Sequence, residues 1–136
     1  MKKSCFVIPV HEPKFEFAIP LVLSYNSYYN DGDIFFVFSS EHEKKLFENR
    51  LNNKDVKYNS IIFTGNQKHW IVTQKKWFGI EYIFNHYNYD YVGAVDAEVM
   101  FLRYLDYNKI FYEKVIDNFI FYTNVNDIFF PFTYIE

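Results

Sequence analysis

Short, nearly continuous apolar runs alternate along the chain with longer stretches in which apolar and polar positions are mixed. Apolar runs rich in β-branched and aromatic residues predict strands that are buried on both faces. Four such strands are expected, with a fifth nearer the C-terminus: residues 5–10, 33–38, 56–63, 91–95 and 118–125. The mixed stretches predict helices. These cover residues 15–29, 41–51, 70–86 and, with a weaker pattern, 106–117.

Capping and breaker residues support these boundaries. Ser40 followed by Glu43 matches a capping box, which predicts that a helix begins there. Pro20 is expected to start the first helix or to lie in its first turn, where a missing backbone N–H costs nothing.

The longest predicted helix, residues 70–86, carries large apolar side chains on one broad face. The members of that face are Trp70, Trp77, Ile80, Ile83 and Phe84. We expect the tryptophans to be core residues rather than a platform for a sugar ring. Lys75 and Lys76 are expected on a solvated face, unless they approach a bound phosphate.

Strand and helix alternate four times, which predicts an α/β fold formed as a single domain, residues 1–136. The expected architecture is a Rossmann-like, mainly parallel sheet flanked by helices. If the strand order is 3-2-1-4, the first and fourth strands are neighbours and the order reverses between them. The loops at His11-Glu12 and Asp96-Ala97-Glu98 would then face each other across one crevice.

The composition excludes several classes of function. With 17 acidic and 14 basic residues, the net charge is −3, so no basic surface is expected for nucleic acid. No apolar run approaches the roughly 20 residues of a membrane span. The apolar run at residues 5–10 is also too short for a signal peptide. The aromatic fraction of 24% accompanies abundant Asn, Lys and Ile. These residues all have AT-rich codons, so a coding bias explains the aromatic fraction without any function.

The cysteine and the histidines add little chemistry. The single cysteine, Cys5, excludes an internal disulfide and favours a reducing, cytoplasmic setting. It is expected to be a small core residue. The histidines lack the spacing of a zinc site. His42 and His86 are expected at the surface, while His11 follows a strand end and is a candidate for ligand contact.

Asp96-Ala97-Glu98 is the leading candidate for chemistry. The two carboxylates directly follow a buried strand and precede another apolar run, residues 99–101. Mg²⁺ and Mn²⁺ prefer oxygen ligands, and Mg²⁺ is often held by one or two carboxylates together with substrate phosphates. The pair therefore predicts a divalent metal site. The alternative is a strand end that carries two exposed acids.

The segment around this motif resembles nucleotide-sugar-dependent glycosyltransferases of the GT-A fold. In that family, a helix bearing Lys or Gln leads through Tyr-Asp-Tyr into a strand and a DxD motif. The matching stretch here runs from His69 to Arg103 and includes Tyr89-Asp90-Tyr91 and Asp96-Ala97-Glu98. Residues 7–13 are similar to the family's first strand and nucleotide-binding loop. The third position of the motif is Glu98, where the family usually has Asp.

The resemblance implies a GT-A-like domain that binds a nucleotide-diphosphate sugar and transfers the sugar to a glycan or lipid-linked acceptor. It implies that Asp96 contacts the ribose or a water on the metal, and that Glu98 ligates Mn²⁺ or Mg²⁺. The metal would neutralise charge on the leaving diphosphate. The other residues implied in nucleotide-sugar binding are Pro9, Val10, His11, Glu12, Lys76 and Ala97. No residue stands out as a catalytic base.

Enzymes of this family are considerably longer than 136 residues. The apolar residues 128–136 resemble a core segment, so we expect the donor-binding half of a transferase, incomplete at its C-terminus, which self-associates through this segment. Two alternatives remain. One is a catalytically inactive fragment or nucleotide-binding module that needs a partner chain, and the other is an unrelated Rossmann-like domain.

Overall fold

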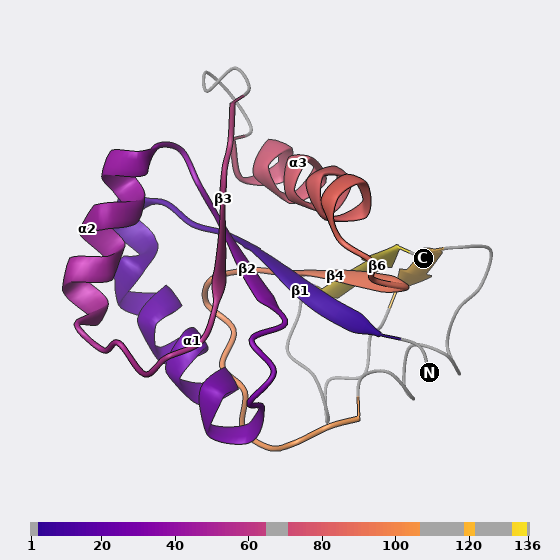
Figure 1. Ribbon diagram of the computed structural model, residues 1–136, viewed down its shortest axis with the longest axis horizontal. Coiled ribbons are helices and arrows are strands. Elements are labelled where there is room, and N and C mark those ends of the chain that lie inside the picture. Colours follow the sequence, from indigo (N-terminus) through magenta and orange to yellow (C-terminus); the bar gives the residue numbers. More distant parts are fainter. Residues whose placement is uncertain (1–2, 65–70, 107–118, 122–131, 136) are drawn as a thin grey trace.

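The protein is described by a computed structural model over residues 3–64, 71–106, 119–121 and 132–135. These residues form one mixed sheet with helices on both faces (Figure 1). The strands are β1 (Ser4–Pro9), β2 (Ile34–Phe38), β3 (Asn59–Ile62), β4 (Tyr91–Val95), β5 (Phe119–Phe121) and β6 (Phe132–Ile135). The helices are the short 3₁₀ helix η1 (Glu12–Lys14) and the α-helices α1 (Phe15–Tyr28), α2 (Glu41–Leu51) and α3 (Ile71–His86).

The strand order in the sheet is β3-β2-β1-β4-β6-β5. β1 pairs in parallel with both β2 and β4, and β2 pairs in parallel with β3. The predicted α/β class and the order 3-2-1-4 are therefore confirmed, and the order reverses between β1 and β4. β6 runs antiparallel to its neighbours β4 and β5.

The C-terminal part of the chain differs from the prediction in two respects. The fifth strand, expected at 118–125, is described only as β5, and β6 was not predicted. β6 lies within the apolar segment 128–136 that was expected to self-associate, and its backbone pairs inside the sheet. Apart from Asp106, the predicted helix 106–117 lies outside the described residues.

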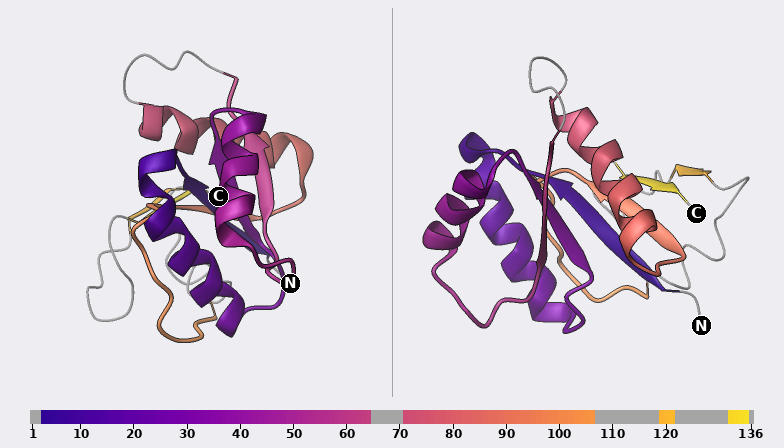
Figure 2. Two further views of the ribbon diagram at one scale, coloured as in Figure 1. Left: turned by 90° about the vertical axis from the view of Figure 1, so that its left-hand side faces the viewer. Right: turned by 45° about the horizontal axis from the view of Figure 1, so that its top comes forward.

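Two hydrophobic clusters, one on each face of the sheet, explain the continuous apolar strands. Alternate residues of β1 enter different clusters: Phe6 and Ile8 pack with α1 and α2, whereas Cys5 and Val7 pack with α3. Figure 2 shows α1 and α2 on one side of the sheet and α3 on the other. Because both faces are covered, every residue of β2 and β4 is buried and no polar alternation can appear.

The buried face of α3 differs from the predicted one. Ile80 and Ile83 are buried as expected, but Trp77 is 50% exposed and Phe84 is 37% exposed, whereas Lys75 is 1% exposed. The face is centred on Lys75, Gly79 and Ile83, which follow one another at i, i+4 spacing. The hydrophobic pattern predicted that Trp77 would face the sheet. The close fit at a glycine instead sets which side of α3 faces the sheet. Trp70 lies outside the described residues.

Other boundaries also shift. α1 begins at Phe15, so Pro20 lies inside the helix rather than in its first turn. The start of α1 is set by Phe15, which is fully buried and packs edge-to-face on Phe47 of α2. β3 begins later than predicted, because the Lys57 N–H donates to the Asn26 side chain at 2.8 Å rather than to β2. Within the described residues, no helix has the length and apolarity needed to cross a membrane.

The predicted capping box at the start of α2 is confirmed. The Ser40 side chain accepts a hydrogen bond from the Glu43 N–H at 3.1 Å. In return, the Glu43 carboxylate accepts from the Ser39 N–H at 2.8 Å. α2 ends at Asn52, whose φ of 45° is the left-handed conformation typical of a helix C-cap. The box fixes the Glu43 carboxylate near the carboxyl edge of the sheet.

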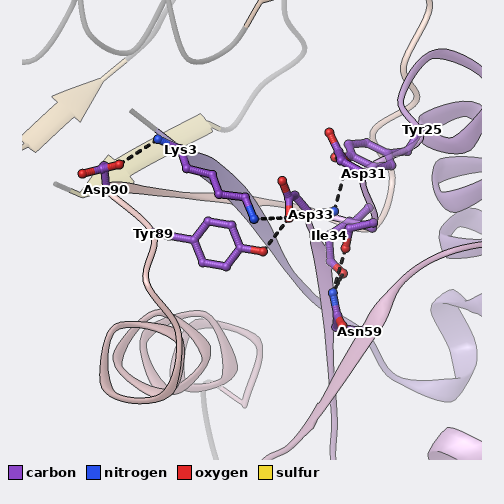
Figure 3. Close-up of polar contacts among 9 residues, drawn as sticks. Lys3, Tyr25, Asp31, Asp33, Ile34, Asn59, Tyr89 and Asp90 are labelled. Carbon is purple, nitrogen blue, oxygen red and sulfur yellow. Dashed lines mark hydrogen bonds and ion pairs between the residues drawn. The ribbon is translucent and has the colours of Figure 1, made fainter. Parts of the chain in front are cut away.

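A polar network joins the opposite, amino edge of the sheet (Figure 3). The Lys3 N–H donates to Asp90 at 2.7 Å, and the Lys3 ammonium lies 3.5 Å from the Asp33 carboxylate. The Tyr89 hydroxyl donates to the same carboxylate at 2.5 Å. Burial raises the pKa of Asp33, against the opposing effect of the Tyr89 hydrogen bond. The network ties the segments before β1, β2 and β4 together, away from the expected ligand edge.

Gly79 provides a test of the α3 packing. A Cβ at this position would lie 2.7 Å from Val7 Cγ1 and 2.8 Å from Val37 Cγ2. Overpacking of this kind costs about 1–3 kcal/mol, which exceeds the roughly 0.5–1 kcal/mol that Ala gains over Gly within a helix. Gly79→Ala is therefore expected to lower the midpoint of denaturant unfolding. Glu81→Ala, an exposed change on the same helix, should stay within about 0.5 kcal/mol of wild type. Equal stability of the two variants would contradict the close packing.

Candidate functional site

A pocket of about 150 Å³ lies at the carboxyl edge of the sheet, where β1 and β4 end side by side. It is lined by Pro9, His11, Lys14, Asp96, Ala97 and Glu98. The strand order reverses at this point, and ligands of open α/β sheets bind in the crevice outside such a reversal. The structure thus brings both candidate loops to one pocket.

The two carboxylates are carried by a tight turn directly after β4. The Val99 N–H closes this turn by donating to the Asp96 carbonyl oxygen at 3.1 Å. Ala97 is buried within the turn, and Val99 and Phe101 anchor the following segment in the core. The apolar anchors on both sides therefore hold the acidic turn at the pocket.

The loop after β1 is equally constrained. The Val10 N–H donates to a carbonyl oxygen of β2 at 3.1 Å, which extends the ladder past the end of the strand. The chain then turns into η1, where the Lys14 N–H donates to the His11 carbonyl oxygen at 2.9 Å. This path places Lys14 beside Glu98.

Each carboxylate of the motif forms an ion pair with a lysine. Lys76 Nζ lies 2.5 Å from Asp96 Oδ1, and Lys14 Nζ lies 2.6 Å from Glu98 Oε1. The hydrogen bond from Lys14 holds the pKa of Glu98 below its usual range. Glu98 is therefore ionised near neutral pH.

The Asp96 carboxylate has an unusual environment. Its Oδ1 atom is buried and accepts no hydrogen bond from any described residue. Its contact with Lys76 is therefore an ion pair without hydrogen-bond geometry. A buried carboxylate oxygen that lacks hydrogen bonds is expensive to desolvate, so this atom is suited to receive a cation.

A buried lysine lies beneath the loop after β1. Lys75 Nζ donates to the Val10 carbonyl oxygen at 2.5 Å and lies 3.5 Å from a Glu43 carboxylate oxygen. Burial lowers the pKa of Lys75, while the Glu43 charge and hydrogen bond oppose that shift. This ammonium connects α3, the end of β1 and the start of α2.

His11 takes its electrostatic character from the same group. Burial lowers its pKa, and the positive charge of Lys75 lowers it further. The carboxylates of Glu43 and Glu98 act in the opposite direction but are weaker than burial. His11 is therefore neutral at pH 7 and presents an imidazole to the pocket.

The remaining predicted site residues are placed differently. The Glu12 carboxylate does not line the pocket. It pairs with the Arg50 guanidinium of α2 at 3.0 Å. Val10 is fully buried and contributes its carbonyl oxygen to Lys75 rather than a side chain to the pocket. Lys76 reaches the site through its ion pair with Asp96.

Two features of the site were missed in the sequence. Lys14 was not singled out, although a cation a few residues after a strand end is a usable signal for this edge. The burial of Lys75 was predicted wrongly, because a hydrophobic pattern cannot show that an ammonium has buried partners. The surface positions of His42 and His86 and the core position of Cys5 are confirmed, whereas His69 lies outside the described residues.

A larger pocket of about 260 Å³ at the amino edge has a structural explanation. The Tyr25 hydroxyl donates to Asp31 at 2.5 Å. The Tyr28 and Tyr29 hydroxyls donate to backbone carbonyl oxygens of residues 102 and 105 at 2.9 and 3.0 Å. These groups fasten the segment after β4 onto α1. Their hydroxyl protons are already donated within the protein.

The pocket at the carboxyl edge offers the type of ligand, carboxylate oxygen, that a divalent metal prefers. Among the described residues, no group of three or more His, Cys, Asp or Glu side chains could enclose a metal. A hard cation that takes further ligands from phosphate and water needs only one or two carboxylates. Asp96 and Glu98 would supply these, and the buried Asp96 Oδ1, which has an ion-pair partner but accepts no hydrogen bond from the described residues, agrees with that use. The two lysines compete with a metal for the same oxygens.

No protein-family model matches the chain, and no curated protein matches its sequence.

Removing Lys75 tests the electrostatics of the site. In Lys75→Met, the Val10 carbonyl oxygen loses its donor, and an unsatisfied buried group of this kind costs about 1–3 kcal/mol. The pKa of His11 should also rise, because the Lys75 charge that lowers it is gone. NMR titration of the His11 imidazole measures this shift. Lys45→Met, at an exposed position of α2, should leave the pKa of His11 unchanged, and an equal shift in both variants would contradict the assignment.

The pH dependence of stability has a defined sign. The pKa of Lys75 is lower in the folded protein than the usual 10.5. Between the folded and unfolded values, the unfolded chain binds more protons, so this group adds stability as pH rises. The unfolding free energy of wild type, relative to that of Lys75→Met, should therefore rise as pH approaches about 10.5 from below. A difference that shrinks over this window would contradict a buried, charged Lys75.

Proposed function

We propose that this chain is the donor-binding domain of a glycosyltransferase. It binds a nucleotide-diphosphate sugar at the carboxyl edge of β1 and β4 and transfers the sugar to a glycan or lipid-linked acceptor. One observation carries the proposal: Asp96, Glu98 and the loop after β1 share one pocket where the strand order reverses. That position is where the resemblance places the diphosphate of the donor.

The size of the pocket indicates which part of the donor it receives. Small-molecule sites usually measure about 300–1,000 Å³, and this pocket measures about 150 Å³. It suits the diphosphate and its cation. The nucleobase and ribose would lie along the adjoining loop, beside Pro9 and His11.

Mn²⁺ or Mg²⁺ would be held by Asp96 and Glu98, with phosphate oxygens and water completing the coordination. The bound ion would supply charge neutralisation for the leaving diphosphate. Lys14 and Lys76 are close enough to these carboxylates to add positive charge on the same side of the ligand. The longer side chain of Glu98, in place of the usual Asp, keeps the oxygen chemistry and extends its reach.

We also propose a cytoplasmic setting, which the environment of Cys5 supports. The thiol is free and buried in the cluster beneath α3, and burial raises its pKa well above the usual value. A protein with this single protected thiol suits the reducing conditions of the cytoplasm.

Ligand-dependent stability tests the proposal. Thermal unfolding would be measured with a panel of nucleotide-diphosphate sugars, with and without Mn²⁺. A ligand at 100 times its Kd adds about 2.7 kcal/mol to the unfolding free energy. We expect such a shift with one nucleotide, dependent on Mn²⁺ and lost in Asp96→Asn and Glu98→Gln. Asp55→Asn, in the exposed turn before β3, should retain it.

Turnover separates the enzyme from its alternatives. Release of the nucleoside diphosphate in the presence of an acceptor supports a transferase. A metal-dependent shift without turnover would instead favour a binding module that needs a partner chain. A folded protein that no nucleotide stabilises would leave an unrelated Rossmann-like domain as the better interpretation.

A further inference from the structure

Positive and negative groups are matched in number around the pocket. Three lysine ammonium groups face three carboxylates: Lys14 pairs with Glu98, Lys76 with Asp96 and Lys75 with Glu43. These groups together present no net positive charge to a phosphate-bearing ligand. Each of these three ammonium groups is already paired with a carboxylate.

We infer that the Lys14–Glu98 and Lys76–Asp96 pairs are exchangeable. Asp96 and Glu98 give up their lysine partners when they bind a divalent cation, and the freed ammonium groups then bind the diphosphate. This inference rests on the proposed function and states how the same site is regulated. The cation and the anion bind cooperatively, because each releases the protein groups that the other needs.

The three lysines differ in their freedom to exchange. Lys75 is 1% exposed and is held by both Val10 and Glu43, so it is fixed in place. Lys14 and Lys76 are 39% and 23% exposed. Ion pairs near the surface contribute little to stability, and the flexible four-carbon stem of lysine allows its ammonium group to move. The two pairs at the motif are therefore the ones that can open.

The environment of the Asp96 carboxylate favours replacement of Lys76 by a cation. Its Oδ1 atom is buried, accepts no hydrogen bond from the described residues and contacts Lys76 as an ion pair alone. A divalent cation satisfies a buried carboxylate oxygen at least as well as a single ammonium group does. Replacement of Lys76 by the cation therefore leaves no carboxylate oxygen unpaired, and the displaced ammonium group finds a new partner in the phosphate.

Thermodynamic linkage makes the effects reciprocal. If the cation strengthens anion binding by some factor, the anion strengthens cation binding by the same factor. The same reasoning applies to the side chains. A lysine competes with the cation, and a carboxylate competes with the anion, so removal of either competitor should strengthen binding of its rival.

The test measures these cross-effects with two simple probes. Binding of Mn²⁺ alone would be followed by the EPR signal of the free ion, and binding of inorganic pyrophosphate alone by calorimetry in the presence of a chelator. Lys14→Met and Lys76→Met should bind Mn²⁺ at least about fivefold more tightly than wild type, the lower end of typical coupling. Asp96→Asn and Glu98→Gln should strengthen metal-free pyrophosphate binding by a similar factor.

Matched controls separate exchange from a general change in net charge. Lys57→Met and Asp55→Asn make the same charge changes in the segment before β3, which lies at the amino edge of the sheet, away from the pocket at the carboxyl edge. At 0.15 M salt the screening length is about 8 Å, so these variants should change either affinity less than twofold. If the motif variants shift affinity no more than the controls do, the exchange is wrong. Lys14 and Glu98 are partly exposed, so their variants should remain folded, which circular dichroism checks.

The outcomes distinguish this inference from the proposed function. Cross-effects in a protein that no nucleotide-diphosphate sugar stabilises support the exchange and contradict the donor site. Binding of a nucleotide sugar without cross-effects supports the donor site and overturns the exchange. If neither wild type nor any variant binds Mn²⁺ or pyrophosphate at millimolar concentration, both are overturned.

Discussion

The buried ammonium group of Lys75 is the interaction on which the carboxyl edge of the sheet depends. It joins the last carbonyl oxygen after β1 to the Glu43 carboxylate, which the capping box of α2 already holds in place. Loss of one partner from a buried charged pair costs far more than the net contribution of the intact pair. Three elements from distant parts of the chain are therefore held in one arrangement, and one of them, the end of β1, leads into the loop that lines the pocket.

The position of Lys75 also determines what its neighbours can do. Gly79, one turn later, lets α3 approach Val7 and Val37 so closely that no Cβ would fit. With Lys75 inserted toward the sheet, the next residue along the helix, Lys76, emerges at the rim and reaches Asp96. The same rotation of α3 leaves Trp77 half exposed. The packing of a glycine against two valines thus selects which lysine is structural and which is available at the pocket.

Much of the fold could be predicted from the sequence, because its signals are local. Buried strands such as β2 are continuous apolar runs, and the Ser40 and Glu43 capping box is a pattern over a few residues. The acidic turn after β4 and its place beside β1 followed from the alternation of strand and helix, once a strand order was assumed. The rotation of α3, the burial of Lys75 and the role of Lys14 could not be predicted, because they depend on contacts between distant segments. β6 was not predicted, because the sequence pattern of a single segment does not show which strand it pairs with.

An acidic turn next to a buried strand must be stable in the folded protein and must also leave its carboxylates available to a ligand. The ion pairs of the pocket meet both requirements. A carboxylate such as Asp96, with one oxygen buried, would destabilise the fold if it had no counter-charge. Lys76 supplies that charge from within the chain, and Lys14 does the same for Glu98. A bound cation would supply the same positive charge to these carboxylates, so the lysines could be replaced without leaving a carboxylate unpaired. On the proposed function, the lysines that neutralise these carboxylates in the protein alone would also set how strongly an ion and an anion depend on each other at this edge.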